Sequence, residues 1–335
     1  MKVLLITPKM TGIGGVAPHV SKLRSLLLDS GHEVDVISVE NVPHVPIKGL
    51  YNPSFTISSY FKSLCLRAGG RKYDVAHAHN FPSWPAASVS DSRIKVITVH
   101  GIFSSQHRAL HGWAAGSIAS RLEKRWASGA DVLTCVSKSS LKYYAQFSKR
   151  AVYVPNAIDI SSLPKESIRV AERQVVCIGR LSYEKGTDVL VDALDRVDSS
   201  ITVLIIGSGR DELVSEAVRK HPNVKYLGYQ PHEIAMKYLK GSDALVLPSR
   251  EEGLPTVLLE AMALRVPVIA SEIEEITQIT KNVVSVSHPS ALAEAINSVV
   301  LGGSSPDVNG AYEEVKEYDW NNVYKKYIEV YEGRV

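Results

Sequence analysis

The sequence predicts an α/β protein built from two doubly wound, Rossmann-like domains that face each other across a cleft. Short runs rich in Val, Ile and Leu alternate with helical patterns along the chain. Runs such as Ile201–Gly207 (ITVLIIG) are apolar almost throughout, which is typical of parallel strands buried on both faces. The 335 residues are enough for two domains, and the polar stretch Asp159–Arg173 is the expected linker.

The first half of the chain holds the first set of predicted strands. We assign them to Val3–Thr7, Glu33–Val39, Asp74–His79, Lys95–His100, Asp131–Val136 and Ala151–Pro155. Helical patterns lie between several of them, at Gly15–Ser30, Trp113–Ser128 and Lys138–Phe147. Strands and helices that alternate in this way form parallel sheets with helices on both faces. We therefore expect an N-terminal domain of residues 1–160.

The second half repeats this alternation and predicts a C-terminal domain of residues 174–317. Its strands are expected at Gln174–Gly179, Ile201–Gly207, Val224–Leu227, Ala244–Pro248, Val266–Ala270 and Val283–Val286. Its helices are expected at Thr187–Val197, Asp211–Lys220, Glu233–Gly241, Pro255–Leu264 and Ser290–Leu301. Residues 318–335 are aromatic and helical in period, and we expect this last segment to pack back toward the N-terminal domain.

The composition indicates a globular protein, with 45% hydrophobic and 22% charged residues. No apolar run reaches the roughly 18 residues that a membrane-spanning helix needs. Cys65, Cys135 and Cys177 are far apart and form no CxxC pair, which argues against a disulfide framework or a zinc site. We therefore expect a cytoplasmic location with a reducing environment.

The charge is distributed unevenly along the chain. Residues 1–150 carry 19 Lys and Arg against 8 Asp and Glu, a net charge of +11, whereas residues 151–335 carry 19 against 27, a net charge of −8. Such an asymmetry suggests an anionic partner that only one domain contacts, or merely an uneven solvated surface. No pattern of stacking aromatics or of a recognition helix supports a nucleic-acid partner.

Glycines and histidines follow the strands of the first half. Gly14 and Gly15 open a helix, where a backbone can approach a ligand closely and N–H groups can receive an anion. The pattern lacks the third glycine of G-x-G-x-x-G, so a dinucleotide is not expected and a plain tight turn is the alternative. His100 could meet a substrate hydroxyl, although a lone histidine is more often structural. His77, His79 and His100 are enough histidines for a metal site, but no carboxylate or cysteine accompanies them. We therefore expect no metal.

Two cations lie in the loop Gly179–Gly186 (GRLSYEKG), which follows a strand and precedes a helix. The Arg180 guanidinium can form bidentate hydrogen bonds with two oxygen atoms, and the Lys185 ammonium adds a second positive charge. The loop therefore suits a diphosphate, and a surface loop with incidental basic residues is the alternative.

Two glutamates flank the start of a predicted helix within Ser249–Ser271. Pro255 suits the first helical turn, and free N–H groups near Gly253–Thr256 could receive a phosphate. Because an acid beside that anion is unfavourable by charge alone, Glu252 and Glu260 belong there only if they accept hydrogen bonds from hydroxyls. A sugar and a ribose joined by a diphosphate supply both sets of hydroxyls. The alternative is that Glu252 caps the helix and Glu260 is solvated, but Glu260 lies in the otherwise apolar stretch VLLEAMAL.

These motifs resemble those of the retaining glycosyltransferases of family 4, which have the GT-B fold, and the resemblance covers nearly the whole chain. The matching stretches are Gly14-Gly15, the histidine of TVHG, VPNAID (154–159), GRLSYEKG (179–186), LIIGSG (204–209), NVKYLGY (223–229) and PSREEGLPTVLLEAMA (248–263). The most specific feature is the pair of glutamates separated by seven residues and followed by PVIAS.

The resemblance implies a role for each matching residue. Arg180 and Lys185 would bind the donor diphosphate, Glu260 the ribose hydroxyls and Glu252 the donor sugar, while His100 would lie near that sugar. His100, Arg180, Lys185 and Glu252 are the implied catalytic residues. The other implied donor-binding positions are Gly14, Gly15, Gly179, Gly207, Gly209, Leu227, Gly253, Leu254, Pro255 and Thr256.

The implied activity is retaining transfer of a sugar from a UDP- or GDP-sugar to a hydroxyl acceptor, without a metal ion or a cofactor. The acceptor would be a sugar, a glycan or a lipid-linked molecule bound by the first domain. The basic and apolar stretch Trp113–Arg125 could rest on an anionic membrane at its inner face. The alternatives are a nucleotide-sugar-binding subunit without turnover, or an epimerase or phosphorylase on the same fold.

The chain departs from the family pattern at three places. Arg265 lies near the position where the family usually has a glycine, residues 272–275 (EIEE) replace a frequent glycine pair, and Ala157 replaces a common glycine. The first two changes lie beside the donor helix and could alter donor choice or domain closure.

Overall fold

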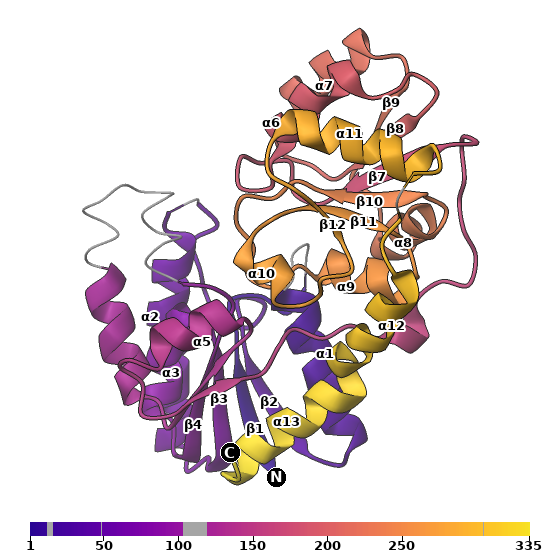
Figure 1. The fold of residues 1–335 in the computed structure, drawn as a ribbon. Helices are drawn as coiled ribbons and strands as arrows, with labels where there is room; N and C mark the ends of the chain where they lie inside the picture. Colours follow the sequence, from indigo (N-terminus) through magenta and orange to yellow (C-terminus); the bar gives the residue numbers. More distant parts are fainter. Residues whose placement is uncertain (12–15, 48, 103–118, 304) are drawn as a thin grey trace. The chain divides into compact units, whose positions relative to one another are not determined.

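The computed structural model describes residues 1–335 except 12–15, 48, 103–118 and 304 (Figure 1). The chain divides into two compact units. The N-terminal unit comprises Met1–Asn156 and Asn321–Val335, and the C-terminal unit comprises Ala157–Trp320. A six-stranded sheet forms the centre of each unit, and neighbouring strands run parallel in both sheets. The predicted fold class of two doubly wound, Rossmann-like domains is confirmed.

The sheet of the N-terminal unit has the strand order β2-β1-β3-β4-β5-β6. Its strands are β1 (Lys2–Ile6), β2 (Glu33–Ile37), β3 (Tyr73–His79), β4 (Ser92–Val99), β5 (Val132–Cys135) and β6 (Ala151–Tyr153). Strand β1 is an inner strand next to the edge strand β2, since Leu5 pairs with Val36 on one side and with His77 on the other. Every strand that the sequence predicts in this half is present.

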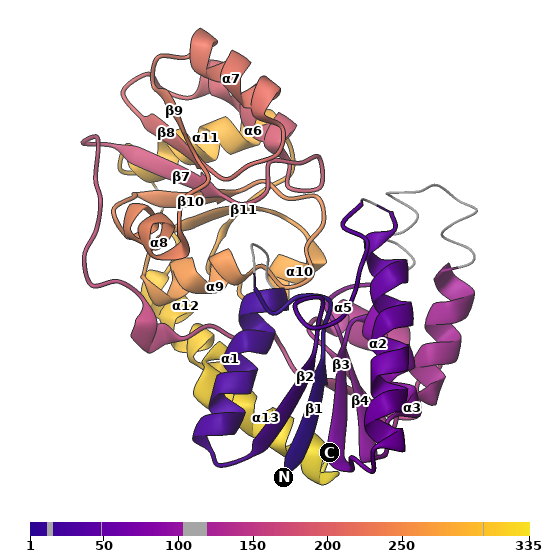
Figure 2. The same cartoon turned by 180° about the vertical axis from the view of Figure 1, so that it is seen from behind.

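Helices cover the sheet of the N-terminal unit (Figures 1 and 2). They are α1 (Val16–Asp29), α2 (Tyr51–Ala68), α3 (Trp84–Val89), α5 (Lys138–Tyr144) and α13 (Trp320–Glu332), and residues 119–129 are also helical. The prediction did not name α2. The buried residues of this helix are Phe55, Ser59 and Ser63, so its inner face is mostly small and polar and gives no ordinary amphipathic pattern.

The last helix, α13, belongs to the N-terminal unit although it follows the whole C-terminal unit in sequence. Its residues Tyr327 and Tyr331 are fully buried. The Tyr327 hydroxyl lies 3.0 Å from His19 Nε2, and the Tyr331 hydroxyl lies 2.7 Å from His77 Nδ1. These contacts fix the C-terminal segment against α1 and β3.

The sheet of the C-terminal unit has the order β12-β11-β10-β7-β8-β9. Its strands are β7 (Gln174–Ile178), β8 (Thr202–Ile206), β9 (Val224–Gly228), β10 (Ala244–Leu247), β11 (Val268–Ser271) and β12 (Val284–Val286). The predicted strands of the second half are therefore also confirmed. Read from β9 to β12, this order corresponds to the 3-2-1-4-5-6 arrangement of dinucleotide-binding folds.

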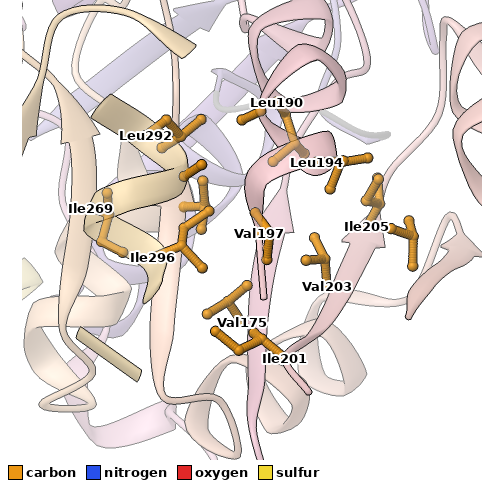
Figure 3. Packing of buried hydrophobic residues seen from close by; sticks show 14 of the residues in the cluster. Val175, Leu190, Leu194, Val197, Ile201, Val203, Ile205, Ile269, Leu292 and Ile296 are labelled. Carbon is orange, nitrogen blue, oxygen red and sulfur yellow. The ribbon is translucent and has the colours of Figure 1, made fainter. Parts of the chain in front are cut away.

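The helices of the C-terminal unit are α6 (Thr187–Ala193), α7 (Asp211–Lys220), α8 (His232–Lys240), α9 (Thr256–Ala263), α10 (Glu274–Thr277), α11 (Pro289–Val300) and α12 (Val308–Val315). Figure 3 shows how α6 and α11 cover one face of the sheet. Leu190 of α6 and Ile296 of α11 pack with Val203 and Ile205 of β8, and all four are buried. This core holds the strands in place, so the loops at their carboxyl ends start from fixed points.

The expected linker, Asp159–Arg173, is tied to the C-terminal unit. Asp159 caps a short 3₁₀ turn by accepting a hydrogen bond from Ser162 N. Further on, Arg169 forms an ion pair with Asp243, and Ile168 N donates to Lys237 O. Among the described residues, no helix is long and apolar enough to cross a membrane.

Candidate active site

The strand order of the C-terminal unit creates a switch point between β7 and β10. The chain continues from β7 to β8 and β9 on one side, and from β10 to β11 and β12 on the other. In such sheets a crevice opens at the carboxyl ends of the two strands where the direction reverses, and ligands bind there. The loops that follow β7 and β10 are the predicted loops 179–186 and 249–255. The structure thus brings the two most specific motifs of the sequence to one point.

Glycines allow these loops to approach closely. Gly207 has φ +148°, and a Cβ atom on it would lie 1.8 Å from the carbonyl oxygen of Gly179. Gly186 has φ +66°, and a Cβ atom there would lie 1.9 Å from the carbonyl oxygen of Pro248. Both distances are far below van der Waals contact. Any side chain at Gly186 or Gly207 would therefore separate the loops.

The implied donor-binding positions after β8 and β9 also lie together. Gly207 N donates a hydrogen bond to Gly228 O over 2.9 Å, and Leu181 forms a β-bridge with Gly209. Leu227 is half-buried directly before Gly228. The loops after β7, β8 and β9 consequently form one continuous edge of the unit.

Lys185 and Glu252 form a direct ion pair. Lys185 Nζ lies 2.6 Å from Glu252 Oε1 and 2.5 Å from Oε2. The Glu252 side chain is only 4% exposed, and Ser249 Oγ donates a further hydrogen bond of 2.7 Å to it. An ammonium group has three N–H donors, so two bonds to the carboxylate leave one donor for another anion.

Arg250 joins the two loops and was not among the predicted residues. Its guanidinium bonds both oxygens of Asp188 at 2.8 and 2.7 Å and stacks 3.9 Å from the centre of the Tyr183 ring. Its backbone N–H donates to Glu184 O. The bond from Arg250 holds the pKa of the Asp188 carboxyl below its usual value. The only sequence signal was its position directly before the two acids of SREEG.

Glu260 is buried on α9 and is not solvated. His232, at the first position of α8, lies 2.6 Å from Glu260 Oε1. This hydrogen bond raises the pKa of the exposed His232 ring above its usual value. Sequence reasoning gave no role to His232, because an isolated surface histidine carries no local pattern.

The N-terminus of α9 lies between these acids in sequence. Pro255 is the N-cap and Thr256 begins the helix, one residue later than predicted. Leu254 is buried, while Gly253 and Thr256 are partly exposed. Arg180 is exposed at the beginning of the loop after β7.

The N-terminal unit has its own switch point, between β1 and β3. Four histidines gather there from α1, β3 and the end of β4. His77 and His79 stack with ring centres 4.1 Å apart, His79 and His100 lie 5.8 Å apart, and His19 lies 5.6 Å from His100. His77 Nε2 lies 2.6 Å from the Thr98 hydroxyl. We define His19, His77, His79 and His100 as the histidine cluster.

Burial lowers the pKa of every member of the histidine cluster. The pKa falls to about 3 for His77 and to about 4 for His100, and lies well below its usual value for His19 and His79. The rings are therefore neutral near pH 7. Within the described part of the chain, both ring nitrogens of His79 and the Nε2 of His100 are buried without a hydrogen-bond partner. A hydrogen bond with Asn156 holds His100.

Three expectations concern residues outside or beside these sites. Gly14 and Gly15 lie outside the described residues. No group of three or more metal-binding side chains that could hold an ion is found in the described ranges.

Arg265 has a left-handed backbone conformation, with φ 56°, just after α9. Its guanidinium stacks 3.7 Å from the centre of the Tyr312 ring of α12. Glycine is favoured in that conformation, which explains why the family pattern has a glycine near this position.

The two halves of the chain match known families. Residues 13–162 match the family described as glycosyltransferase family 4, and residues 172–301 match that described as glycosyl transferases group 1. The chain belongs to this glycosyltransferase family. An uncharacterised glycosyltransferase of Methanocaldococcus jannaschii is 28% identical to it, over 99% of this chain and 98% of that protein. A phosphatidyl-myo-inositol mannosyltransferase of Mycolicibacterium smegmatis is 27% identical, over 99% and 94% respectively.

Solved structures show the same fold. A sucrose-phosphate synthase of Thermosynechococcus elongatus has a TM-score of 0.78 with 20% identity, over 99% of this chain and 98% of that one. An Anabaena protein in complex with UDP and glucose has a TM-score of 0.71 with 17% identity, over 99% of each chain. The glycosyltransferase therefore has the GT-B fold that the resemblance implied.

Proposed function

We propose that this glycosyltransferase moves a sugar from a nucleoside-diphosphate sugar to a hydroxyl acceptor, with retention of configuration. One observation carries the proposal. The Lys185–Glu252 pair, the exposed Arg180 and the N-terminus of α9 all lie on loops that start at the switch point of the C-terminal unit, and Glu260 follows on α9. Cations and free N–H groups suit a diphosphate, and carboxylates suit sugar hydroxyls. The Anabaena protein of the same fold binds UDP and glucose, which agrees with this donor class.

The proposed transfer needs no nucleophile from the enzyme. The bond between the anomeric carbon and the diphosphate oxygen breaks, and its electron pair stays on the diphosphate. The acceptor hydroxyl attacks the anomeric carbon from the face that the leaving group departs, and its proton passes to a diphosphate oxygen. Arg180 and Lys185 stabilise the charge that develops on the leaving group. Fixed charges of this kind often contribute several kcal/mol to catalysis.

The N-terminal unit is proposed to bind the acceptor, which is a sugar, a glycan or a lipid-linked molecule. A neutral His100 can exchange a hydrogen bond with a sugar hydroxyl through its Nε2, and this assignment rests on the family resemblance. Arg180 and Lys185 supply the positive charge that a metal ion supplies in other transferases. We therefore expect transfer to persist after addition of EDTA, and NMR of the product to show the anomeric configuration of the donor.

Calorimetry with a donor panel tests the proposed donor site. The panel contains UDP-glucose, UDP-galactose, UDP-N-acetylglucosamine and GDP-mannose. We expect one donor to bind the wild type and to lose at least about tenfold in affinity with Glu260→Ala, since several charge-assisted hydrogen bonds are lost. Glu233→Ala is the control, because Glu233 is an exposed acid next to His232. Equal affinity for wild type and Glu260→Ala would refute the assignment.

The same donors separate the alternatives. A binding subunit without turnover would bind a donor but neither transfer nor hydrolyse it. An epimerase would convert the bound sugar without an acceptor. A phosphorylase would need a pyridoxal phosphate cofactor, with its absorbance in the purified protein. The intact set of Arg180, Lys185, Glu252 and Glu260 favours transfer.

A further inference from the structure

Helix α2 of the N-terminal unit has two opposite faces. Its buried residues Phe55, Ser59 and Ser63 are spaced four apart and lie on one face. Ser63 Oγ donates to Ala86 O of α3 over 2.7 Å, and Thr56 Oγ1 donates to Pro82 O over 3.0 Å. Small side chains thus seat this face against α3 and the turn before it.

The opposite face of α2 is apolar and exposed. Ile57 is 59% exposed and Phe61 is 60% exposed, and Leu50 at the N-cap is 52% exposed. At about 100° per residue, these three side chains lie within about 40° of one another and about 180° from the buried serines. Ile47, in the segment before the helix, is 58% exposed as well. Four large apolar side chains exposed together are uncommon on a soluble protein and mark an interaction surface.

The charged residues of α2 and of its flanking segments have a single sign. No aspartate or glutamate occurs between residues 41 and 73. Lys62 and Arg67 lie on α2 on either side of the stripe, and Arg71 and Lys72 follow the helix, all exposed. An apolar stripe flanked by cations and free of acids is complementary to a surface that is apolar inside and anionic at its boundary.

We propose that the outer face of α2, with the segment before it, is an interfacial surface that rests on anionic lipid bilayers. The helix lies in the plane of the bilayer, with Ile57 and Phe61 among the acyl chains and Lys62 and Arg67 at the phosphates. A protein partner fits less well, because a stripe that runs from Leu50 to Phe61, about 17 Å at 1.5 Å per residue, would require a matching groove that is apolar inside and acidic at its edges. The sequence placed such a contact on Trp113–Arg125, of which only residues 119–125 are described.

The test is co-sedimentation of the full chain with phosphatidylcholine vesicles, with and without phosphatidylglycerol. We expect binding to the anionic vesicles only, with an affinity that falls as salt increases. The double variant Ile57→Ser/Phe61→Ser is expected to lower the partition coefficient by about tenfold or more, since two exposed apolar anchors are lost. Lys62→Gln/Arg67→Gln is expected to lower it by about tenfold and to weaken its salt dependence.

Two single variants outside α2 serve as controls for the loss of an exposed apolar side chain. Leu301→Ser removes a large apolar side chain that is 45% exposed on the C-terminal unit, and Leu122→Ser removes one that is 39% exposed on helix 119–129. Neither change is expected to alter vesicle binding. Donor affinity measured by calorimetry should be unchanged in every α2 variant, so failure of this inference can be told from failure of the proposed function.

Three results would overturn the proposal. The first is the absence of binding to anionic vesicles. The second is loss of binding with Leu122→Ser while the α2 double variant still binds. The third is a change of oligomeric state in Ile57→Ser/Phe61→Ser with vesicle binding retained, which would assign the surface to a second copy of the chain.

Discussion

The two units share a parallel sheet with one switch point, but they place opposite kinds of side chain there. The C-terminal unit puts ion pairs such as Lys185–Glu252 and Arg250–Asp188 on short loops held together by glycines. The N-terminal unit gathers four neutral histidines from α1, β3 and the residue after β4, and three of them, His19, His77 and His79, are buried. The strand order of each sheet therefore sets where the site lies, and the burial of the side chains at that point sets whether they are charged or neutral. A charged site suits a diphosphate, and a neutral one suits hydroxyl groups.

The glycine contacts of the C-terminal unit should give the largest effect. Gly207→Ala places a Cβ atom 1.8 Å from the Gly179 carbonyl oxygen, so the loops must separate. We expect at least about 3 kcal/mol loss in the free energy of unfolding, as for severe overpacking. Gly228→Ala is the control, since Gly228 has φ +64° with open space around it and should cost only about 1–2 kcal/mol. Equal losses in urea denaturation would contradict the close approach.

The cations of the same unit should affect chemistry more than folding. We expect Lys185→Ala to lower kcat by about 100-fold, since one fixed charge on the leaving group is lost. Arg180→Ala is the companion variant, because Arg180 is exposed and its removal leaves no buried acid uncompensated. Lys220→Ala removes an exposed ion pair with Asp195 and should leave kcat unchanged. Normal kcat in both Lys185→Ala and Arg180→Ala would remove the diphosphate assignment.

The histidines of the two units should respond to pH with opposite sign. The folded-state pKa of His79 is lowered, so the unfolded chain takes up the proton first and stability falls as pH drops below about 6.5. We expect His79→Gln to flatten this loss by up to about 1.4 kcal/mol per pH unit. The pKa of His232 is raised, so its contribution is present at low pH and is lost as pH rises through the folded-state value. His232→Gln should therefore steepen the acid loss, and matching slopes in the two variants would contradict the comparison.

Two residues with positive φ give the smallest expected effect. Asn80 (φ 63°) follows β3, and Arg265 (φ 56°) follows α9; they are the non-glycine residues of this kind in the described ranges. Asn tolerates this conformation, whereas Arg265 relies on stacking with Tyr312. We expect Arg265→Ala to be less stable than Arg265→Gly by about 1 kcal/mol in thermal unfolding, because both variants lose the stacking and only Ala keeps the backbone strain. An Ala variant as stable as the Gly variant would show that the backbone there is unstrained.

Much of the C-terminal site was predictable because its residues are close in sequence. Lys185 lies in a loop between a strand and a helix, and Glu252 and Glu260 flank one helix start, so local patterns place them at the edge of the sheet. His232 was not predictable, because it reaches Glu260 from another helix across 28 positions. The partners of the histidine cluster were still further away, since Tyr327 meets His19 across 308 positions.

The sequence by itself determined the alternation of strands and helices, the two parallel sheets and the motif loops at their carboxyl ends. These features depend on hydrophobic period and on glycine and proline within a few residues. The tertiary structure decided which side of α2 is buried and which helix supplies the tyrosine partners of the histidine cluster. It also decided that Arg265, with a left-handed backbone conformation, stacks on Tyr312. The hydrophobic period of a sequence indicates which side of a helix is buried only where apolar side chains face the core. In α2 Ser59 and Ser63 face the core beside Phe55 while Ile57 and Phe61 face outward, so only packing could reveal its orientation.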